Sequence, residues 1–159
     1  LGLLIARIGF KWTMVIGAAA YTVRCLIFAG ADALGADFSV TMTLACVGQV
    51  LHGFCFGCFL AAAFMYVDRY SPTDIRGSVQ NLYGTLVIGL GFFAGGLVSG
   101  LIGKAYEIRG ANDNDKVTGY HWTEMWLFCA LLAAVCMVAF ALLFPRDAPA
   151  DNTADATSE

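Results

Sequence analysis

The side chains best suited to chemistry in this sequence lie inside its long apolar runs. Gln49, His52 and Phe56 are three and four residues apart, so a helix places all three on one face. An amide, a titratable imidazole and an aromatic ring on one face suit recognition of a polar ring compound, and histidine exchanges protons near neutral pH. The alternative is that Gln49 and His52 hydrogen-bond neighbouring helices, as polar residues in membrane bundles often do. We interpret this face as a candidate substrate site.

Arg24 is the charged residue of a second apolar run, at 12–31. It lies about twelve residues into that run, or roughly 18 Å along a helix. A charge at such a depth in a bilayer costs at least about 2.5 kcal/mol on insertion scales. Two interpretations are open: the guanidinium faces a polar cavity or an acid, or it extends to the outer headgroups.

A group of charges separates two of the apolar runs and consists of Asp68, Arg69, Asp74 and Arg76. These residues are either ordinary solvated loop charges or an ion-pair latch between helices on the cytoplasmic side. The second interpretation assigns a structural or gating role to Asp68, Arg69 and Arg76, and we assign Arg24 to the same class.

The pair Cys55 and Cys58 has the spacing of a redox or metal pair, but it lies within an apolar run and no further Cys/His cluster accompanies it. We interpret the six cysteines as small apolar residues that pack between helices. We recognise no nucleophile–base pair either. The sequence therefore argues against an enzyme, and we expect no cofactor and no metal site.

The elements that must position these residues are long and apolar. Hydrophobic residues make up 59% of the 159 and charged residues 13%, against roughly 25% charged in a soluble domain. A bilayer core about 30 Å thick needs roughly 20 apolar helical residues, and four runs reach that length: 12–31, 40–67, 78–103 and 122–144. The sequence predicts an all-α integral membrane protein in direct contact with the lipid bilayer. A net charge of −3 without a basic run argues against nucleic acid as a partner.

The two ends of the chain differ from these spans. Leu1 to Ile5 is apolar but too short to span, and we interpret it as the end of a fifth helix in a fragment of a larger bundle. Residues 1–144 then form the transmembrane part. Residues 145–159 are acidic, small and polar, which predicts a disordered tail.

The third span is rich in glycine. Gly91 and Gly95, like Gly96 and Gly100, have the GxxxG spacing that permits close backbone approach between helices. We therefore expect this face to pack against a neighbouring helix. A polar loop is predicted to follow at 104–121.

The basic residues in the loops predict the orientation. One side of the membrane holds Arg7, Lys11, Arg69, Arg76 and Arg146, and the other holds Lys104, Arg109 and Lys116. The positive-inside rule places the first group in the cytoplasm. Loops 32–39 and 104–121 then lie outside, and 68–77 and the tail lie inside.

Taken together, the stretches LIARIGFKW, VRCLIFAGA and FMYVDRYSPTDIRGSVQNLYG resemble the C-terminal part of nucleoside:proton symporters of the major facilitator superfamily. The resemblance covers nearly the whole chain up to Pro145. It implies a fragment of the C-terminal six-helix bundle, helices nine to twelve with the end of helix eight, whose N-terminal half lies outside this sequence. It also implies uptake of a nucleoside with protons, by alternating access, at a bacterial inner membrane.

By this resemblance the helix at 40–67 lines the substrate cavity. Phe56 keeps an aromatic that contacts the nucleoside, His52 stands where the family typically has a tyrosine, and Gly57 stands where it typically has an aspartate. Without that acid two alternatives stay open: a facilitator or exchanger of the same fold without proton coupling, or a different polar solute such as a sugar.

Overall fold

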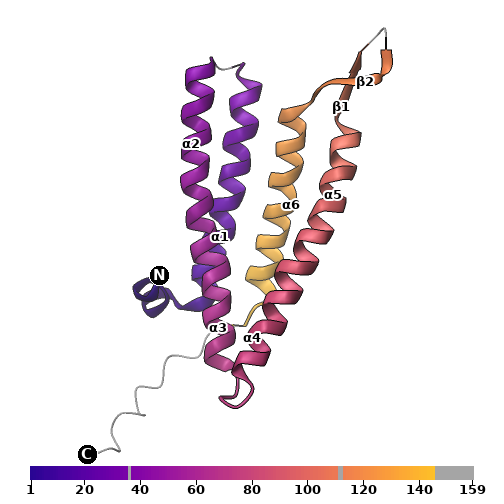
Figure 1. Ribbon diagram of the computed structural model, residues 1–159. Coiled ribbons are helices and arrows are strands. Elements are labelled where there is room, and N and C mark those ends of the chain that lie inside the picture. The colour runs from indigo at the N-terminus through magenta and orange to yellow at the C-terminus, as the bar shows by residue number, and fades with distance from the viewer. Residues whose placement is uncertain (36, 111–112, 146–159) are drawn as a thin grey trace, which may run out of the picture.

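The computed structural model describes residues 1–35, 37–110 and 113–145. Four helical segments are long and apolar enough to cross a membrane, and they run in alternating directions (Figure 1). The predicted all-α membrane class is therefore confirmed. The elements in chain order are α1 (Gly2–Ala33), α2 (Phe38–Cys55), η1 (Phe56–Ala61), α3 (Ala62–Tyr70), α4 (Arg76–Gly84), η2 (Thr85–Leu90), α5 (Gly91–Ala105), β1 (Glu107–Gly110), β2 (Asp113–Tyr120) and α6 (Trp122–Leu143). Apart from Pro145, the predicted disordered tail lies outside the described residues.

Helix α1 is interrupted at Gly9, whose φ of 79° and ψ of 171° are not helical. Glycine adopts a positive φ without the steric cost that a Cβ brings. The Thr13 hydroxyl donates a hydrogen bond to the Gly9 carbonyl over 2.7 Å, which satisfies an acceptor at the break. The residues before Gly9 form a short helical piece that points away from the bundle (Figure 1). The predicted end of a fifth helix is thus joined to the first span by a kink.

Helices α1 and α6 form an antiparallel pair that is fastened at both ends. The Lys11 Nζ donates a hydrogen bond to the Phe144 carbonyl over 2.6 Å, at the C-terminus of α6. At the other end, Asp32 Oδ2 accepts hydrogen bonds from the Thr123 backbone N–H over 2.9 Å and from its hydroxyl over 2.6 Å. A cation at a helix C-terminus and an anion at an N-terminus both complement the helix dipole. These contacts fix the register of the scaffold.

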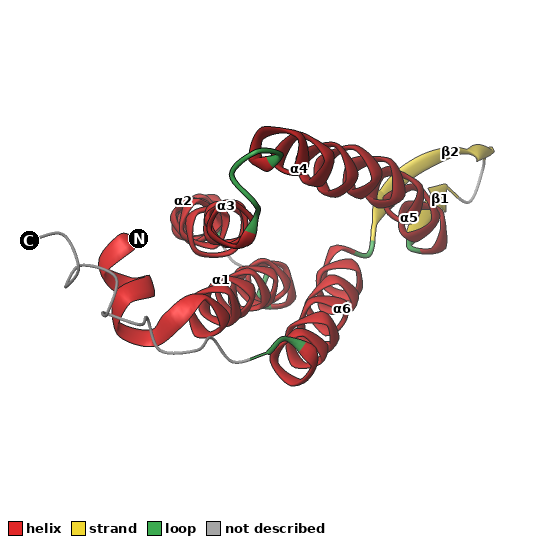
Figure 2. Cartoon of the chain, turned by 90° about the horizontal axis from the view of Figure 1, so that it is seen from below, coloured by secondary structure: helices red, strands yellow, loops and turns green. Residues whose placement is uncertain are grey.

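The segments α2, η1 and α3 continue one another along the other side of α1, and two glycines allow close approach (Figure 2). A Cβ added at Gly17 would lie only 2.7 Å from the backbone nitrogen of Phe59. A Cβ added at Gly48 would lie 2.5 Å from the ring of Phe28. Both distances are below normal van der Waals contact. Helix α1 and the α2–η1 segment therefore approach each other at two positions where one of the two carries a glycine.

The glycine-rich span α4–η2–α5 stands apart from this packing, and none of its described residues is buried. A Cβ added at Gly91, Gly95, Gly96 or Gly100 would meet no atom within 4 Å. The predicted packing of this face against a neighbour is therefore wrong for the helices of this chain. GxxxG spacing permits close approach, but it does not specify which helix approaches.

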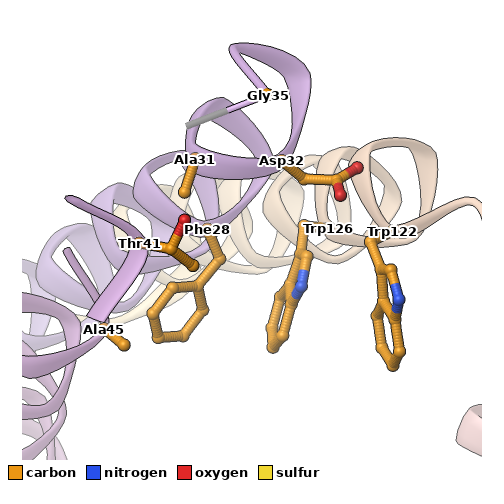
Figure 3. A pocket seen from close by; sticks show the side chains of 8 residues that line it. All are labelled: Phe28, Ala31, Asp32, Gly35, Thr41, Ala45, Trp122 and Trp126. Atoms are coloured by element: carbon orange, nitrogen blue, oxygen red, sulfur yellow. The ribbon is translucent and has the colours of Figure 1, made fainter. Parts of the chain in front are cut away.

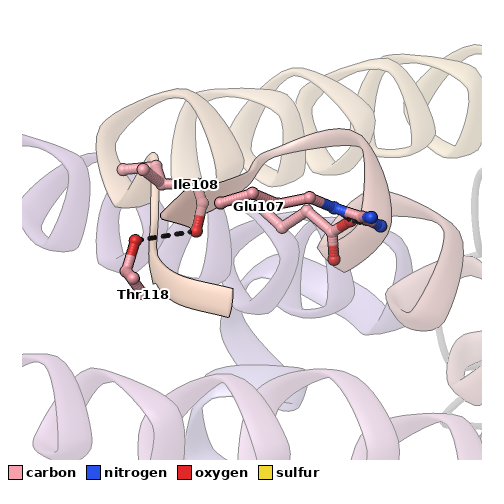
Figure 4. Close-up of polar contacts among 4 residues, drawn as sticks. Glu107, Ile108 and Thr118 are labelled. Atoms are coloured by element: carbon pink, nitrogen blue, oxygen red, sulfur yellow. Dashed lines mark hydrogen bonds and ion pairs between the residues drawn. The ribbon is translucent and has the colours of Figure 1, made fainter. Parts of the chain in front are cut away.

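The predicted polar loop at 104–121 contains an antiparallel hairpin, so its assignment as loop was wrong. The Thr118 hydroxyl donates a hydrogen bond to the Ile108 carbonyl over 3.0 Å (Figure 4), and Arg109 pairs with Glu107. Residues 117–120 include valine, threonine and tyrosine, which favour strands. The polar composition of the segment concealed this preference.

Candidate functional site

The intramembrane arginine lies directly beside the predicted site residues. Arg24 Nη1 is 3.1 Å from His52 Nδ1, and Arg24 Nη2 donates a hydrogen bond to Gln49 Oε1 over 3.2 Å. Arg24 Nε is buried and has no hydrogen-bond partner among the described residues. The guanidinium thus turns across to α2. Within the described residues the guanidinium pairs with a histidine and an amide, not with an acid.

Aromatic rings hold this guanidinium from its own helix. Arg24 Cζ lies 5.1 Å from the ring centroid of Phe28 and 5.9 Å from that of Tyr21. Both distances are within the range of cation–π attraction. Tyr21, Arg24 and Phe28 are three and four residues apart, the same spacing as in Gln49, His52 and Phe56. Sequence reasoning missed Tyr21 and Phe28, although this repeated helical spacing could have indicated them.

Towards the end of the bundle with the hairpin, the same aromatic row continues. The Phe28 ring lies 4.8 Å from that of Trp126, centroid to centroid. These rings and Trp122 line a hollow of about 370 Å³ between α1, α2 and α6, where they lie side by side beneath Asp32 (Figure 3). An aromatic surface therefore leads from this end of the bundle to Arg24.

His52 and Phe56 share a second hollow, of about 440 Å³, between α1, the α2–η1 segment and α6. Tyr21, Phe59 and Phe140 contribute further rings to its walls. Its size and mostly apolar lining with a few polar groups are typical of pockets for small organic ligands. Gln49 lies outside this lining, and its side chain bonds Arg24. The predicted three-residue face is thus divided, with His52 between the hollow and the arginine.

The helix that carries this face changes geometry at Phe56, the first residue of the π-helical turn η1. Turns of this kind are rare and often mark functional sites in helices. Gly57 lies in the same turn, and a Cβ added there would meet no described atom within 4 Å. The position therefore has room for a side chain.

Of the three loop charges predicted to act in gating, the structure brings two together. Asp68 Oδ1 lies 3.7 Å from Arg76 Nε, and Gln80 Nε2 donates a hydrogen bond to the same oxygen over 2.8 Å. These contacts join α3 to α4. Arg69 is exposed and forms no ion pair with any described residue. With the Asp68 and Arg76 side chains 47% and 40% exposed, this ion pair contributes about 1 kcal/mol or less.

The two cysteines of the C-x-x-C spacing are free and buried. Cys55 Sγ donates a hydrogen bond to the His52 carbonyl over 3.0 Å. Among the described residues, no group of three or more His, Cys, Asp or Glu side chains is placed to hold a metal ion.

Comparison with known proteins places these helices in a family of membrane transporters. The nucleoside H⁺ symporter family model matches residues 1–148, and the chain belongs to that family. The family and its named relatives are transporters, not enzymes. With four helices of spanning length, the chain is part of a multi-pass protein of the inner membrane.

Individual relatives agree with this assignment. The chain is 28% identical over 143 residues to the putative nucleoside transporter YegT of Escherichia coli. This alignment covers 87% of the chain and 31% of the relative. It is 27% identical over 134 residues to the xanthosine permease of E. coli, an alignment that covers 84% of the chain and 29% of the relative. It is 26% identical over 140 residues to the nucleoside permease NupG of E. coli, an alignment that covers 88% of the chain and 31% of the relative. The chain therefore spans about three tenths of the length of these relatives. No solved structure matches it.

Proposed function

We propose that these helices belong to a transporter that takes up a nucleoside by proton symport with alternating access. The family match over residues 1–148 carries this proposal. Helices outside these 159 residues complete the substrate path, in agreement with the greater length of the relatives. In this proposal the hollow between α1, α2–η1 and α6 forms one wall of that path.

Within the hollow, we assign Phe56 to the base of the nucleoside and His52 to one of its polar groups. Phe56 is 58% exposed and lines the hollow, so its ring is accessible from there. Stacking of a nucleobase on an aromatic side chain contributes about 1–3 kcal/mol in single-stranded nucleic-acid sites. Arg24 bonds His52 directly, and Gln49 bonds Arg24 in turn. Asp68, Arg69 and Arg76 belong to the cytoplasmic end of the moving helices.

The second candidate function is facilitated diffusion or exchange by the same fold without proton coupling, and Gly57 is the observation that favours it. In the symporters that the sequence resembles, an aspartate typically stands at this position. The described side chains that line the hollow include no carboxylate. The histidine in this wall is His52.

Introducing an acid at Gly57 is expected to separate the two candidates. Gly57→Asp should at least double the ratio of nucleoside uptake measured with an inward proton gradient to uptake without one, because a carboxylate in the turn after Phe56 adds a proton-binding group to this helix. The space around Gly57 accommodates the side chain. Uptake into proteoliposomes holding the complete transporter measures this ratio.

The matched control is Gly57→Asn, which has nearly the same shape but does not titrate. Equal gradient responses of the Asp and Asn variants would contradict the assignment of this position to proton coupling. A wild-type protein that takes up nucleoside with no response to the gradient would support the facilitator instead.

The proposed orientation predicts which loops a membrane-impermeant thiol reagent can reach. In a protein whose native cysteines are replaced, Leu34→Cys should be labelled from outside intact cells, and Thr73→Cys should be labelled only after the membrane is opened. Both positions are exposed. A cysteine in the tail at 145–159 should behave like Thr73→Cys. Labelling of Thr73→Cys from outside, with Leu34→Cys protected, would reverse the proposed topology.

A further inference from the structure

The contact between Arg24 and His52 restricts the protonation of the histidine. A guanidinium carries only N–H donors and stays charged at any physiological pH. At 3.1 Å from Arg24 Nη1, His52 Nδ1 must therefore accept the hydrogen bond with its lone pair. The Cys55 thiol, 3.9 Å from the same nitrogen, donates to the His52 carbonyl instead. The lone pair of Nδ1 thus faces the arginine.

We propose that Arg24 fixes neutral His52 in the form that carries its proton on Nε2, and that binding of a further proton at Nδ1 breaks the Arg24–His52 contact. This inference rests on the proposed function and names its coupling site. A proton that adds to the Nδ1 lone pair gives an imidazolium with two N–H groups and no acceptor. The hydrogen bond to Arg24, which keeps its own protons, cannot then form.

The neighbours of Arg24 and His52 favour the breaking of their contact when His52 is protonated. If the contact with His52 breaks, Arg24 retains the Gln49 oxygen at 3.2 Å and the rings of Phe28 and Tyr21. The other titratable groups around His52 are Tyr21 from α1, Cys55 on its own helix and Cys136 from α6, all of them lining the same hollow. No carboxylate among the described side chains of that lining offsets the two cations. Protonation would therefore drive them apart.

The same geometry predicts what His52 presents to a substrate. On the imidazole ring Nε2 points away from Nδ1, and His52 borders the hollow that it shares with Phe56. Neutral His52 would then offer an N–H donor rather than an acceptor. The substrate class that fits is a nucleoside that places a carbonyl or hydroxyl oxygen near His52 while its base stacks on Phe56.

The tautomer can be measured directly in the complete transporter reconstituted in lipid and labelled with ¹⁵N-histidine. This chain has two histidines, His52 and His121, and subtracting the spectrum of His52→Gln identifies the signals of His52. Near neutral pH we expect an unprotonated Nδ1 and a protonated Nε2 in the wild type. Arg24→Lys retains a cationic donor and should keep this tautomer, whereas Arg24→Met should give a mixture of both.

Gln49→Leu serves as the control, because Gln49 bonds Arg24 and not His52. The tautomer of His52 in Gln49→Leu should match that in the wild type. A wild-type His52 with its proton on Nδ1 would overturn the inference, and so would an unchanged single tautomer in Arg24→Met. The wild-type spectrum alone tests the assigned tautomer of His52, even if Arg24→Met does not fold.

Transport adds a second readout. In Arg24→Gln, the pH profile of nucleoside uptake should shift towards higher pH, because a proton on His52 no longer has to displace a cation. An unchanged pH profile would overturn the coupling role of the pair. If the wild type takes up no nucleoside at all, the proposed function fails, while the tautomer measurement still decides the inference about Arg24 and His52.

Discussion

Replacement of Gly17 by alanine is expected to reduce the amount of folded protein in the membrane severalfold. A Cβ at this position would lie 2.7 Å from the Phe59 nitrogen and 3.0 Å from the Cys58 carbonyl carbon. Both are backbone atoms, so no rotation of a side chain relieves the contact. Overpacking of this kind typically costs about 1–3 kcal/mol. Gly17→Leu should have a still larger effect.

The matched control is Gly95→Ala, which makes the same chemical change in another spanning helix with no atom within 4 Å. Thermal unfolding and size-exclusion profiles of the two purified variants provide the comparison. Equal stability of the two variants would contradict the close approach of α1 to η1. If Gly95→Ala alone were damaged, the glycine-rich face would be shown to pack on a helix outside this chain.

The sequence predicted the spanning helices because their signal is local. Twenty apolar residues without charge are costly to leave in water and sufficient to cross a bilayer, and the structure has four helices that are long and apolar enough to do so. The glycine-rich face failed as a prediction for a different reason. Its spacing is a property of one helix, whereas contact needs a partner, and within this chain the close approaches occur at Gly17 and Gly48.

The candidate site was predictable in part. His52 and Phe56 share a hollow, as expected for residues four apart on one helix. The contacts of Arg24 with His52 and Gln49 were not predictable, because they depend on the register of α1 against α2. That register is set by long-range contacts such as Phe28 against Gly48, which no local pattern reveals. The π-helical turn at Phe56 also leaves no recognised signal in the sequence.

Replacement of Phe56 by alanine is expected to reduce nucleoside uptake tenfold or more at substrate concentrations below saturation. Phe56 is 58% exposed, and its ring borders the hollow shared with His52. Its loss removes a stacking surface whose contribution is about 1–3 kcal/mol per base, and a factor of ten corresponds to about 1.4 kcal/mol. The abundance of the protein in the membrane should stay close to that of the wild type, because Phe56 is mostly exposed and its loss removes few packing contacts inside the bundle.

The control for this experiment is Phe54→Ala on the same helix. Phe54 is 48% exposed, a similar fraction, but it lies outside the lining of the hollow. If the effect arises from stacking, Phe56→Tyr should retain most of the uptake, Phe54→Ala should leave it nearly intact, and Phe56→Ala should lose it through weaker substrate binding. Should Phe56→Ala and His52→Ala both transport like the wild type, this face of α2–η1 serves packing alone. Equal losses in Phe54→Ala and Phe56→Ala would instead indicate a general requirement for aromatic bulk on this helix, since only one of the two rings can reach a substrate in the hollow.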